Sequence, residues 1–268
     1  MPEDVLKRIT EALKIDAGRV ERKLVTFIRK KVLEAEAGGV VIGLSGGIDS
    51  SVTAALCVRA LGPKKVMGIS LPEIGVSDPS DVADARQVAD NLGVDFRVID
   101  IAPVVKAMRE QLGFKPEAKL PNANILPRVR MVALYYYANL LNRLVAGCSN
   151  RSELRIGYFT KYGDGASDFA PLGSLYKTQV RELASHLGIP RQIIEKTPTA
   201  GLWRGQTDEG ELGISYKDLD MILVGLDLGF KPAAIARAVG LSPGEVRSIL
   251  ERERRNLHKL KPPEIPSL

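Results

Sequence analysis

The chain of 268 residues is long enough for a full hydrophobic core and favours one large α/β domain with appended helices over two equal domains. Its 45% hydrophobic and 26% charged residues are typical of a folded globular protein and exclude a disordered one. The net charge of +6 suits a polyanionic small molecule and a nucleic acid equally well.

Neither a disulfide framework nor a metal site is indicated by the two cysteines, Cys57 and Cys148. A reducing cytoplasm is the simplest environment for such a chain. The first residues are acidic and have no signal-peptide core, and the most apolar run, 131–141, is interrupted by Asn139. We therefore expect a cytoplasmic protein without a membrane partner.

Two helical patterns come first, at residues 4–15 and 19–37, and form a helical N-terminal segment 1–37. In the second pattern, Val20, Leu24, Ile28 and Val32 fall on one helix face and charged residues on the other. This helix is predicted to pack on one side only.

The next stretch predicts a phosphate site. Residues 40–44 are typical of a buried strand and residues 48–61 of a helix, so Ser45-Gly46-Gly47 forms the turn between them. Glycines let the backbone approach an anion at a helix N-terminus. The pattern is neither a Walker A loop nor a dinucleotide-binding turn. Asp49 would repel phosphate unless a divalent cation lay between them, which favours Mg²⁺; alternatively, Asp49 only stabilises the helix start.

Strands and helices then alternate, which predicts an α/β fold with a doubly wound, mostly parallel sheet and additional N- and C-terminal helices. Strands are expected at 66–71, 96–101 and 143–147, helices at 80–92, 103–112 and 125–141, and a loop at 113–124. In such sheets ligands bind beyond the carboxyl ends of the strands. The segments that follow Leu44, Leu71, Ile101 and Gly147 should therefore surround the site.

Three later segments have the composition of functional loops. Residues 157–168 are dense in Gly, Lys and Asp, for which a solvated turn is the alternative. Lys177 lies in the first turn of a helix that begins near residue 175, where a cation opposes the helix dipole and indicates an anionic ligand, unless it is simply exposed. Residues 198–210 are predicted to form a lid over the substrate.

Helices are expected again at 216–226, 232–239 and 242–254. The last two resemble a helix-turn-helix around Gly240-Leu241-Ser242, so a DNA-binding module is one alternative. The second helix offers few base-reading donors, which favours a helical hairpin packed on the core. The predicted organisation is a single domain, 1–268, with an α/β core 38–200, a lid 198–213 and C-terminal helices 214–260.

Together these motifs resemble a known family. Ser45-Gly46-Gly47-Ile48-Asp49-Ser50 is similar to the pyrophosphate loop of N-type ATP pyrophosphatases. With Tyr158-Phe159-Thr160-Lys161-Tyr162-Gly163-Asp164-Gly165, and with residues 128–131, 147–153, 198–200, 205–209 and 258–259, the chain resembles ammonia-dependent NAD⁺ synthetase along nearly its whole length.

The resemblance implies a two-step reaction that ends NAD⁺ biosynthesis. The carboxylate of deamido-NAD⁺ attacks the α-phosphorus of ATP, which releases pyrophosphate and leaves an acyl-adenylate. Ammonia then displaces AMP to form the amide. Activation is needed because a carboxylate is a poor electrophile and a mixed anhydride is a good one.

The resemblance also implies roles for individual residues. Asp49, Glu153 and Lys177 would be catalytic, and Asp49 and Glu153 would bind Mg²⁺. The ATP-binding residues would be Gly43, Leu44, Ser45, Gly46, Gly47, Ile48, Asp49, Ser50, Cys148, Lys177 and Thr199. The residues for deamido-NAD⁺ would be Arg128, Lys161, Asp168, His258 and Lys259.

Two positions depart from the family pattern. Cys148 replaces a common Thr that contacts ATP, and a thiol is a weak hydrogen-bond partner. Gly201 replaces a common Asp in the lid. Both bear on affinity and leave the reaction unchanged.

The resemblance further implies a homodimer, with N- and C-terminal helices packed between the subunits. Because no amidohydrolase domain is recognised, free ammonia is the expected nitrogen source unless a separate glutaminase supplies it. The alternative enzymes are other adenylating ATP pyrophosphatases, such as a transfer-RNA thiolation enzyme or a purine-nucleotide amidating subunit. No nucleic-acid partner is expected.

Overall fold

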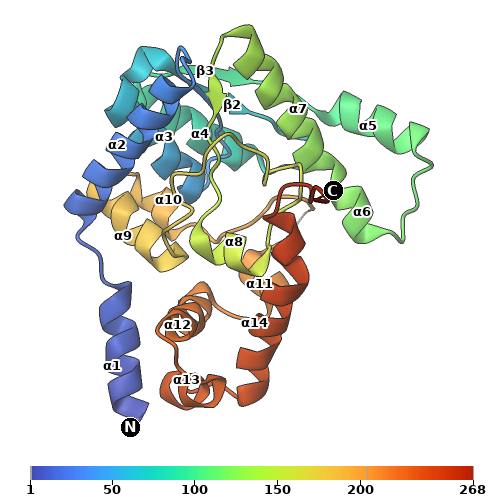
Figure 1. Ribbon diagram of the computed structural model, residues 1–268. Coiled ribbons are helices and arrows are strands. Elements are labelled where there is room, and N and C mark those ends of the chain that lie inside the picture. Colours follow the sequence, from blue (N-terminus) through green and yellow to red (C-terminus); the bar gives the residue numbers. More distant parts are fainter. Residues whose placement is uncertain (1, 204, 268) are drawn as a thin grey trace.

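A parallel sheet forms the centre of the computed structural model, which describes residues 2–203 and 205–267 (Figure 1). Its strands are β1 (Val40–Gly43), β2 (Val66–Ser70), β3 (Asp95–Val98) and β4 (Leu144–Val145). They lie in the order β3-β2-β1-β4, and every pairing is parallel. The predicted α/β class is confirmed, and Ala146 extends the sheet by pairing with Phe169.

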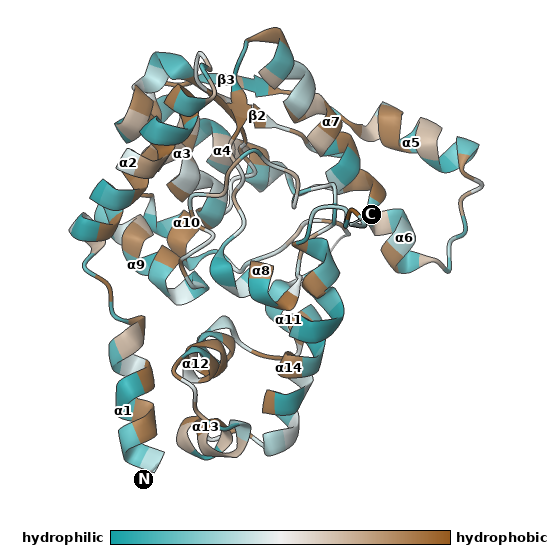
Figure 2. Ribbon diagram, in the orientation of Figure 1, coloured by the Kyte–Doolittle hydropathy of each residue, from teal (hydrophilic) through white to brown (hydrophobic). Residues whose placement is uncertain are grey.

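Side chains of β1 alternate between two hydrophobic clusters, as the pleat of a strand requires. Val40 and Ile42 belong to the cluster on one face, and Val41 belongs to the cluster on the other. The strand is buried on both faces, which explains its unbroken apolar sequence. Figure 2 shows the same property in β2, which is largely brown.

One face of the sheet is covered by helices that come from both halves of the chain. They are α2 (Ala17–Glu34), α3 (Ile48–Leu61), α4 (Pro79–Leu92), α9 (Lys177–Leu187) and α10 (Arg191–Glu195), and the 3₁₀ turn η1 (Pro63–Lys65) leads into β2. Leu24, Ile28 and Val32 of α2 are buried in this cluster. Their apolar face is therefore covered within the chain, and the one-sided packing predicted for this helix is made against its own core.

The other face is covered mainly by α7 (Ile125–Leu140), with α5 (Ala102–Gln111) beside it and α6 (Lys119–Ala123) before it. In Figure 1, α5 and α6 project to the right of the sheet. The prediction of a loop over 113–124 is wrong for α6. A five-residue helix that contains Pro121 is too short to show a helical period.

A third hydrophobic cluster joins the first helix to the last ones. Its elements are α1 (Pro2–Leu13), α8 (Arg151–Ile156), α12 (Tyr216–Asp227), α13 (Pro232–Val239) and α14 (Pro243–Asn256), near α11 (Asp208–Leu212) and the 3₁₀ turn η2 (Leu257–Lys259). Ile235, Val246 and Ile249 are buried, so the pair α13–α14 packs as the expected hairpin, with α14 against α8.

Besides α6, three short helices were not expected from the sequence: α8, α10 and α11. The predicted lid 198–213 is therefore a loop only up to α11, and residue 204 of this segment lies outside the described residues. Each of these helices has five or six residues, which is less than two turns. Within the described ranges, no helix is long and apolar enough to cross a membrane.

Candidate active site

The phosphate loop connects β1 to α3 at the carboxyl end of the sheet. Gly46 has φ of 80°, and a Cβ there would lie 2.2 Å from the carbonyl oxygen of Asp81, so this position requires glycine. Ser50 Oγ accepts from Ser45 N at 3.2 Å and donates to Gly47 O at 3.0 Å. Gly47, the N-cap of α3, provides no side-chain cap. The first amides of this 14-residue helix are thus available to an anion.

Beside this loop, three charged side chains from distant parts of the chain meet. Lys177 Nζ donates to Asp49 Oδ2 at 2.5 Å and to Glu153 Oε1 at 3.3 Å. The Lys177 side chain is 2% exposed, against 17% for Asp49 and 15% for Glu153. The three predicted catalytic residues therefore form one buried cluster, and the lysine is not a surface residue.

Local structure explains how α8 presents Glu153. Asn150 is the N-cap of this helix: its side chain accepts from Glu153 N at 3.1 Å, and Glu153 Oε2 accepts from Asn150 N at 3.2 Å. This capping box uses one carboxylate oxygen and leaves the other toward Lys177. Asn150 Nδ2 also donates to Asp49 Oδ1 at 3.0 Å, which ties α8 to α3.

A second group of polar side chains lies around Glu153. Tyr216 OH is 3.4 Å from Glu153 Oε1 and 3.1 Å from Asp208 Oδ2. Tyr158 OH donates to Asp208 Oδ1 at 3.2 Å and lies 2.8 Å from Glu211 Oε2. Asp208 and Glu211 belong to α11, so the end of the lid segment is fixed beside the charged cluster.

Burial and charge shape the ionisation of this cluster. Burial raises the pKa of the Glu153 carboxyl above its ordinary value, and it raises that of Asp208 as well. Burial alone would lower the pKa of Lys177, but Asp49 and Glu153 raise it overall. The lysine is therefore cationic, and the acidic side chains around it outnumber it. Because burial disfavours the ionised forms of Glu153 and Asp208, a further cation beside these carboxyls would lower their pKa values and stabilise the ionised forms.

The structure places the remaining predicted ATP residues at different distances from this cluster. Cys148 Sγ lies 4.0 Å from the carbonyl oxygen of Gly43, beside the phosphate loop, and burial raises the pKa of this thiol to about 12. Thr199 is exposed in the lid segment, where its Oγ1 accepts from Gly201 N at 3.1 Å. In the described part of the chain, no hydrogen bond joins Thr199 to the phosphate loop.

Four of the five residues predicted to bind deamido-NAD⁺ lie together. Arg128 of α7 donates to Lys161 O at 3.3 Å, and Lys161 Nζ donates to His258 O at 3.0 Å. Lys259 Nζ donates to Gly157 O at 2.7 Å and to Phe159 O at 2.9 Å. These contacts connect α7, the segment 157–168 and η2 in one basic group.

Asp168, the fifth residue, has other partners. It lies beside β4, where it accepts from Val145 N at 2.7 Å and from Tyr135 OH at 3.3 Å. Burial and the nearby Asp168 carboxylate raise the pKa of Tyr135 to about 12. No hydrogen bond joins Asp168 to the basic group among the residues described here.

The sequence did not single out Tyr216 or Asp208 for function. An aromatic residue in an amphipathic helix indicates a core position, and Tyr216 gave no other signal. For Asp208 there was a signal, because it lies in the motif 205–209. Asn150 also had one, since Asn-x-x-Glu is an N-cap pattern.

Fold and site together define an α/β nucleotide-binding enzyme: a parallel sheet with a glycine-rich phosphate loop, a buried lysine and two carboxylates beside it. The family model described as NAD synthase matches residues 20–263. The chain belongs to the NAD synthase family. Because this family uses ATP as a co-substrate in NAD biosynthesis, the predicted class of reaction is confirmed.

Individual relatives agree with this assignment. The chain is 52% identical over 211 residues to the NH₃-dependent NAD⁺ synthetase of Archaeoglobus fulgidus, covering 79% of this chain and 85% of the relative. It is 44% identical to the enzyme of the same name from Methanosarcina mazei, and the match covers 95% of this chain and 100% of the relative. Among solved structures, NMN synthetase from Francisella tularensis superposes with a TM-score of 0.84 at 35% identity, covering 95% and 100%.

Proposed function

We propose that this chain amidates deamido-NAD⁺ with ammonia at the expense of ATP, through an acyl-adenylate. The observation that carries the proposal is the convergence of Lys177, Asp49 and Glu153 beside the phosphate loop. The two close archaeal relatives carry the name of this activity. Loop amides and the α3 dipole would bind the phosphates of ATP.

Lys177 would act as a point charge on phosphate oxygens. Its cation is already held in place by Asp49 and Glu153, so little reorganisation is needed when charge develops on the departing pyrophosphate. The carboxylate oxygen of the pyridine substrate forms a bond to the α-phosphorus while the bond to pyrophosphate breaks. Ammonia then attacks the activated carbonyl carbon, AMP leaves, and the proton lost from nitrogen passes to solvent.

The donor set around Lys177 fits Mg²⁺. In the described part of the chain, no group of three or more His, Cys, Asp or Glu side chains could hold a metal ion by itself. Mg²⁺ is typically bound by one or two carboxylates together with substrate phosphates, and Asp49 and Glu153 would provide these carboxylates. When bound, the ion neutralises charge on the phosphate oxygens.

The basic group of Arg128, Lys161, His258 and Lys259 would bind the anionic dinucleotide, and Asp168 would accept hydrogen bonds from it. Lys161→Ala is then expected to raise the KM for deamido-NAD⁺ about 10-fold or more, with the KM for ATP nearly unchanged, because a charge-assisted contact is worth roughly 1.5–3 kcal/mol. Steady-state kinetics measure both constants. Lys261→Ala, a control at the surface lysine paired with Glu264, should change neither. A changed ATP affinity with an unchanged dinucleotide affinity would refute the assignment.

Free ammonia is the proposed nitrogen source, since both archaeal relatives are named as NH₃-dependent. Glutamine should then support turnover only when a separate glutaminase is added. A cytoplasmic location is proposed as well, because Cys57 and Cys148 are both free thiols.

NMN is a second candidate product, because the Francisella tularensis neighbour is described as NMN synthetase. The corresponding substrate would be the mononucleotide with a free pyridine carboxylate. The chemistry at the carboxylate is the same in both cases, so the two candidates differ only in what the basic group binds.

A product assay tests the proposal. Purified protein is incubated with Mg-ATP, ammonium and either the dinucleotide or the mononucleotide acid, and the amide and AMP are quantified together. Equal amounts of NAD⁺ and AMP, with a clear preference for the dinucleotide, are expected. Formation of AMP without either amide would support cleavage of ATP to AMP but refute both proposed substrates. A preference for the mononucleotide would establish the second candidate.

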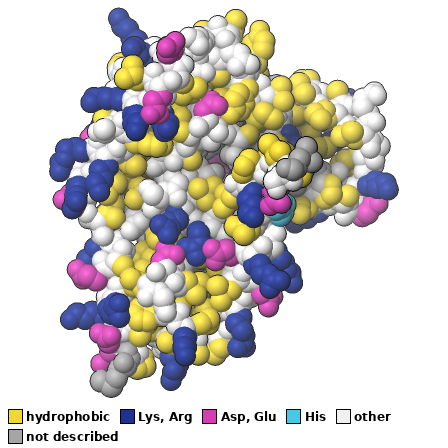
Figure 3. Space-filling model, viewed as in Figure 1, with side chains coloured by type: hydrophobic (Ala, Val, Ile, Leu, Met, Phe, Trp, Pro, Cys, Tyr) yellow, Lys and Arg dark blue, Asp and Glu magenta, His cyan; other side chains and the backbone are white. Residues whose placement is uncertain are grey.

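A homodimer is proposed, with its interface on α7 in place of α2. Val132, Tyr136 and Leu140 share one face of α7 at four-residue spacing and are 62%, 62% and 63% exposed. Figure 3 shows hydrophobic side chains gathered at the upper right, where α5 and α7 lie. Such a patch on a soluble chain marks an interaction surface.

Leu140→Glu is expected to convert the dimer to a monomer, because a charge would be buried at the interface. Light scattering after size exclusion gives the mass. The matched control is Leu33→Glu on α2, whose leucine is 79% exposed and belongs to the helix that covers the opposite face of the sheet; it should remain dimeric. A wild-type monomer, or a Leu140→Glu dimer, would contradict the interface.

A further inference from the structure

We propose that Asp220 of α12 is a positioning residue that sets the distance between Glu153 and Lys177 by holding the first turns of α8 and α9 together. The inference rests on the function proposed for those two residues. Asp220 contacts neither the phosphate loop nor the basic group, so it would act through Ser152 and the backbone of α9.

The hydrogen bonds of Asp220 converge from both helices. The residue is fully buried, with 0% exposure. Ser152 Oγ donates to Asp220 Oδ1 at 2.5 Å, and Thr178 N donates to Asp220 Oδ2 at 2.8 Å. Ser152 Oγ in turn accepts from Lys177 N at 2.9 Å. Both oxygens of one carboxylate are therefore used to connect α8 and α9.

Each partner lies next to a side chain of the charged cluster. Ser152 immediately precedes Glu153, and Thr178 immediately follows Lys177. A shift at either end of this tie would displace the carboxylate or the ammonium group by a similar amount. Misplacement of about 1 Å can lower a rate by about 10²-fold.

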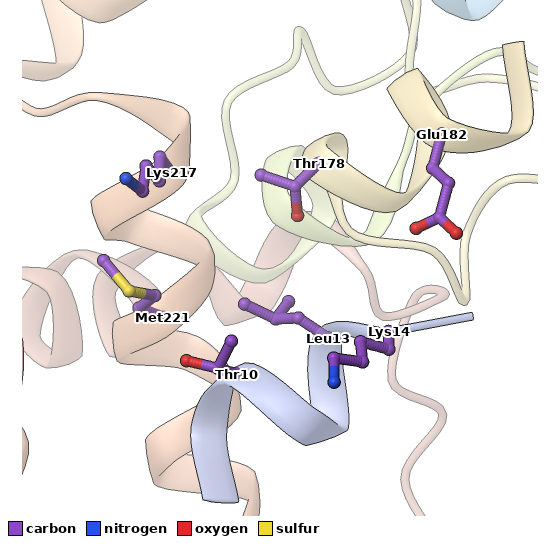
Figure 4. A pocket seen from close by; sticks show the side chains of 7 residues that line it. All are labelled: Thr10, Leu13, Lys14, Thr178, Glu182, Lys217 and Met221. Atoms are coloured by element: carbon purple, nitrogen blue, oxygen red, sulfur yellow. The ribbon is translucent and has the colours of Figure 1, made fainter. Parts of the chain in front are cut away.

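The first turn of α9 is not packed on every side. A cavity of about 380 Å³ lies between α1, α9 and α12, lined by Thr10, Leu13, Thr178 and Met221 among others (Figure 4). The side chain of Thr178 lines this cavity. α8 has only six residues, too few to be stable without external contacts. Hydrogen bonds therefore contribute to holding both turns.

The charge of Asp220 contributes as well. Thr178 is the second residue of α9, so a carboxylate bound to its amide lies at the positive end of an 11-residue helix. Tyr216 and Asp220 are separated by four residues on α12 and face the same way. One helix of the C-terminal part thus supports the site with a hydroxyl near Glu153 and a carboxylate behind Lys177.

Asp220→Asn is the informative substitution because it keeps the size of the side chain. The amide oxygen can still accept from Thr178 N, but an NH₂ group then faces Ser152 Oγ, whose own hydrogen loses its acceptor. Ser152→Ala removes the hydrogen bond between Ser152 and Asp220 by deleting its donor, and it replaces Asp220→Asn in the test if that variant folds poorly. Asp218→Asn is the matched control, because Asp218 lies on the same helix and only caps it with Ser215.

The readouts are kcat, the KM of each substrate, the melting temperature, and calorimetric binding of Mg-ATP in the absence of the pyridine substrate. We expect Asp220→Asn to lower kcat about 10-fold to 100-fold and to weaken Mg-ATP binding, with the KM for the dinucleotide changed less than about threefold. Asp218→Asn should lower the melting temperature without lowering kcat.

A double-mutant cycle completes the test. If Asp220 acts through Ser152, the kcat of the variant that carries both Asp220→Asn and Ser152→Ala should lie within about threefold of the kcat of the less active single variant. Multiplicative losses, or a normal kcat and normal Mg-ATP binding in the folded Asp220→Asn protein, would overturn the inference. Mg-ATP binding needs no dinucleotide, so this comparison remains decisive even if wild-type protein forms no amide and the proposed function fails.

Discussion

Replacing Lys177 by methionine is expected to lower kcat about 10²-fold to 10³-fold, because it removes a preorganised positive charge from the departing pyrophosphate. Methionine is similar in length to lysine but carries no charge. The ammonium group has two carboxylate partners and is almost completely buried, so no water can replace it without rearrangement of the site.

Kinetics at saturating Mg²⁺ measure this effect. Lys217→Met is the control, because Lys217 is exposed and adjacent in sequence to Tyr216; its kcat should equal that of the wild type. Removal of Lys177 leaves Asp49 and Glu153 facing each other without compensation, so the variant should also melt at lower temperature when Mg²⁺ is absent. A Lys177→Met protein with normal kcat would contradict the role of the lysine.

Asp49→Asn and Glu153→Gln are expected to lower kcat about 100-fold or more while the fold is retained. Each substitution keeps the shape of the side chain and removes a negative oxygen that would face Mg²⁺. The Mg²⁺ concentration that gives half-maximal rate should rise in both variants. Titration of Mg²⁺ at fixed ATP measures it.

Glu34→Gln, at a surface carboxylate paired with Lys31, should leave both kcat and the Mg²⁺ dependence unchanged. Rates equal to wild type in both Asp49→Asn and Glu153→Gln at saturating Mg²⁺ would remove the metal assignment. If only one of the two substitutions lowers kcat, the protein would contribute a single carboxylate to the Mg²⁺ ion.

The sheet and its long helices could be predicted because their periodicities are local. The sequence 40–43 is apolar on both faces, and α3 follows after a turn that only glycine permits at Gly46. The five- and six-residue helices could not be predicted in this way, since they complete fewer than two turns.

The charged cluster could be predicted only in part. Asp49, Glu153 and Lys177 were predicted from motifs and resemblance. Their contacts could not be predicted from a local pattern, because Asp49 lies 101 residues from Asn150 and 128 residues from Lys177. Asp220 had no sequence signal, because an acidic residue in an amphipathic helix indicates an exposed face. Its burial depends on Ser152 and Thr178, which are 68 and 42 residues away.

In the proposed reaction, a carboxylate of the pyridine substrate attacks the α-phosphorus of ATP beside Lys177, Asp49 and Glu153. Deamido-NAD⁺ labelled with ¹⁸O in its pyridine carboxylate tests this directly, with mass spectrometry of the products after turnover with Mg-ATP and ammonium. We expect one labelled oxygen in the phosphate of AMP and none in pyrophosphate. Label in inorganic phosphate with ADP as the second product, or AMP without label, would contradict it.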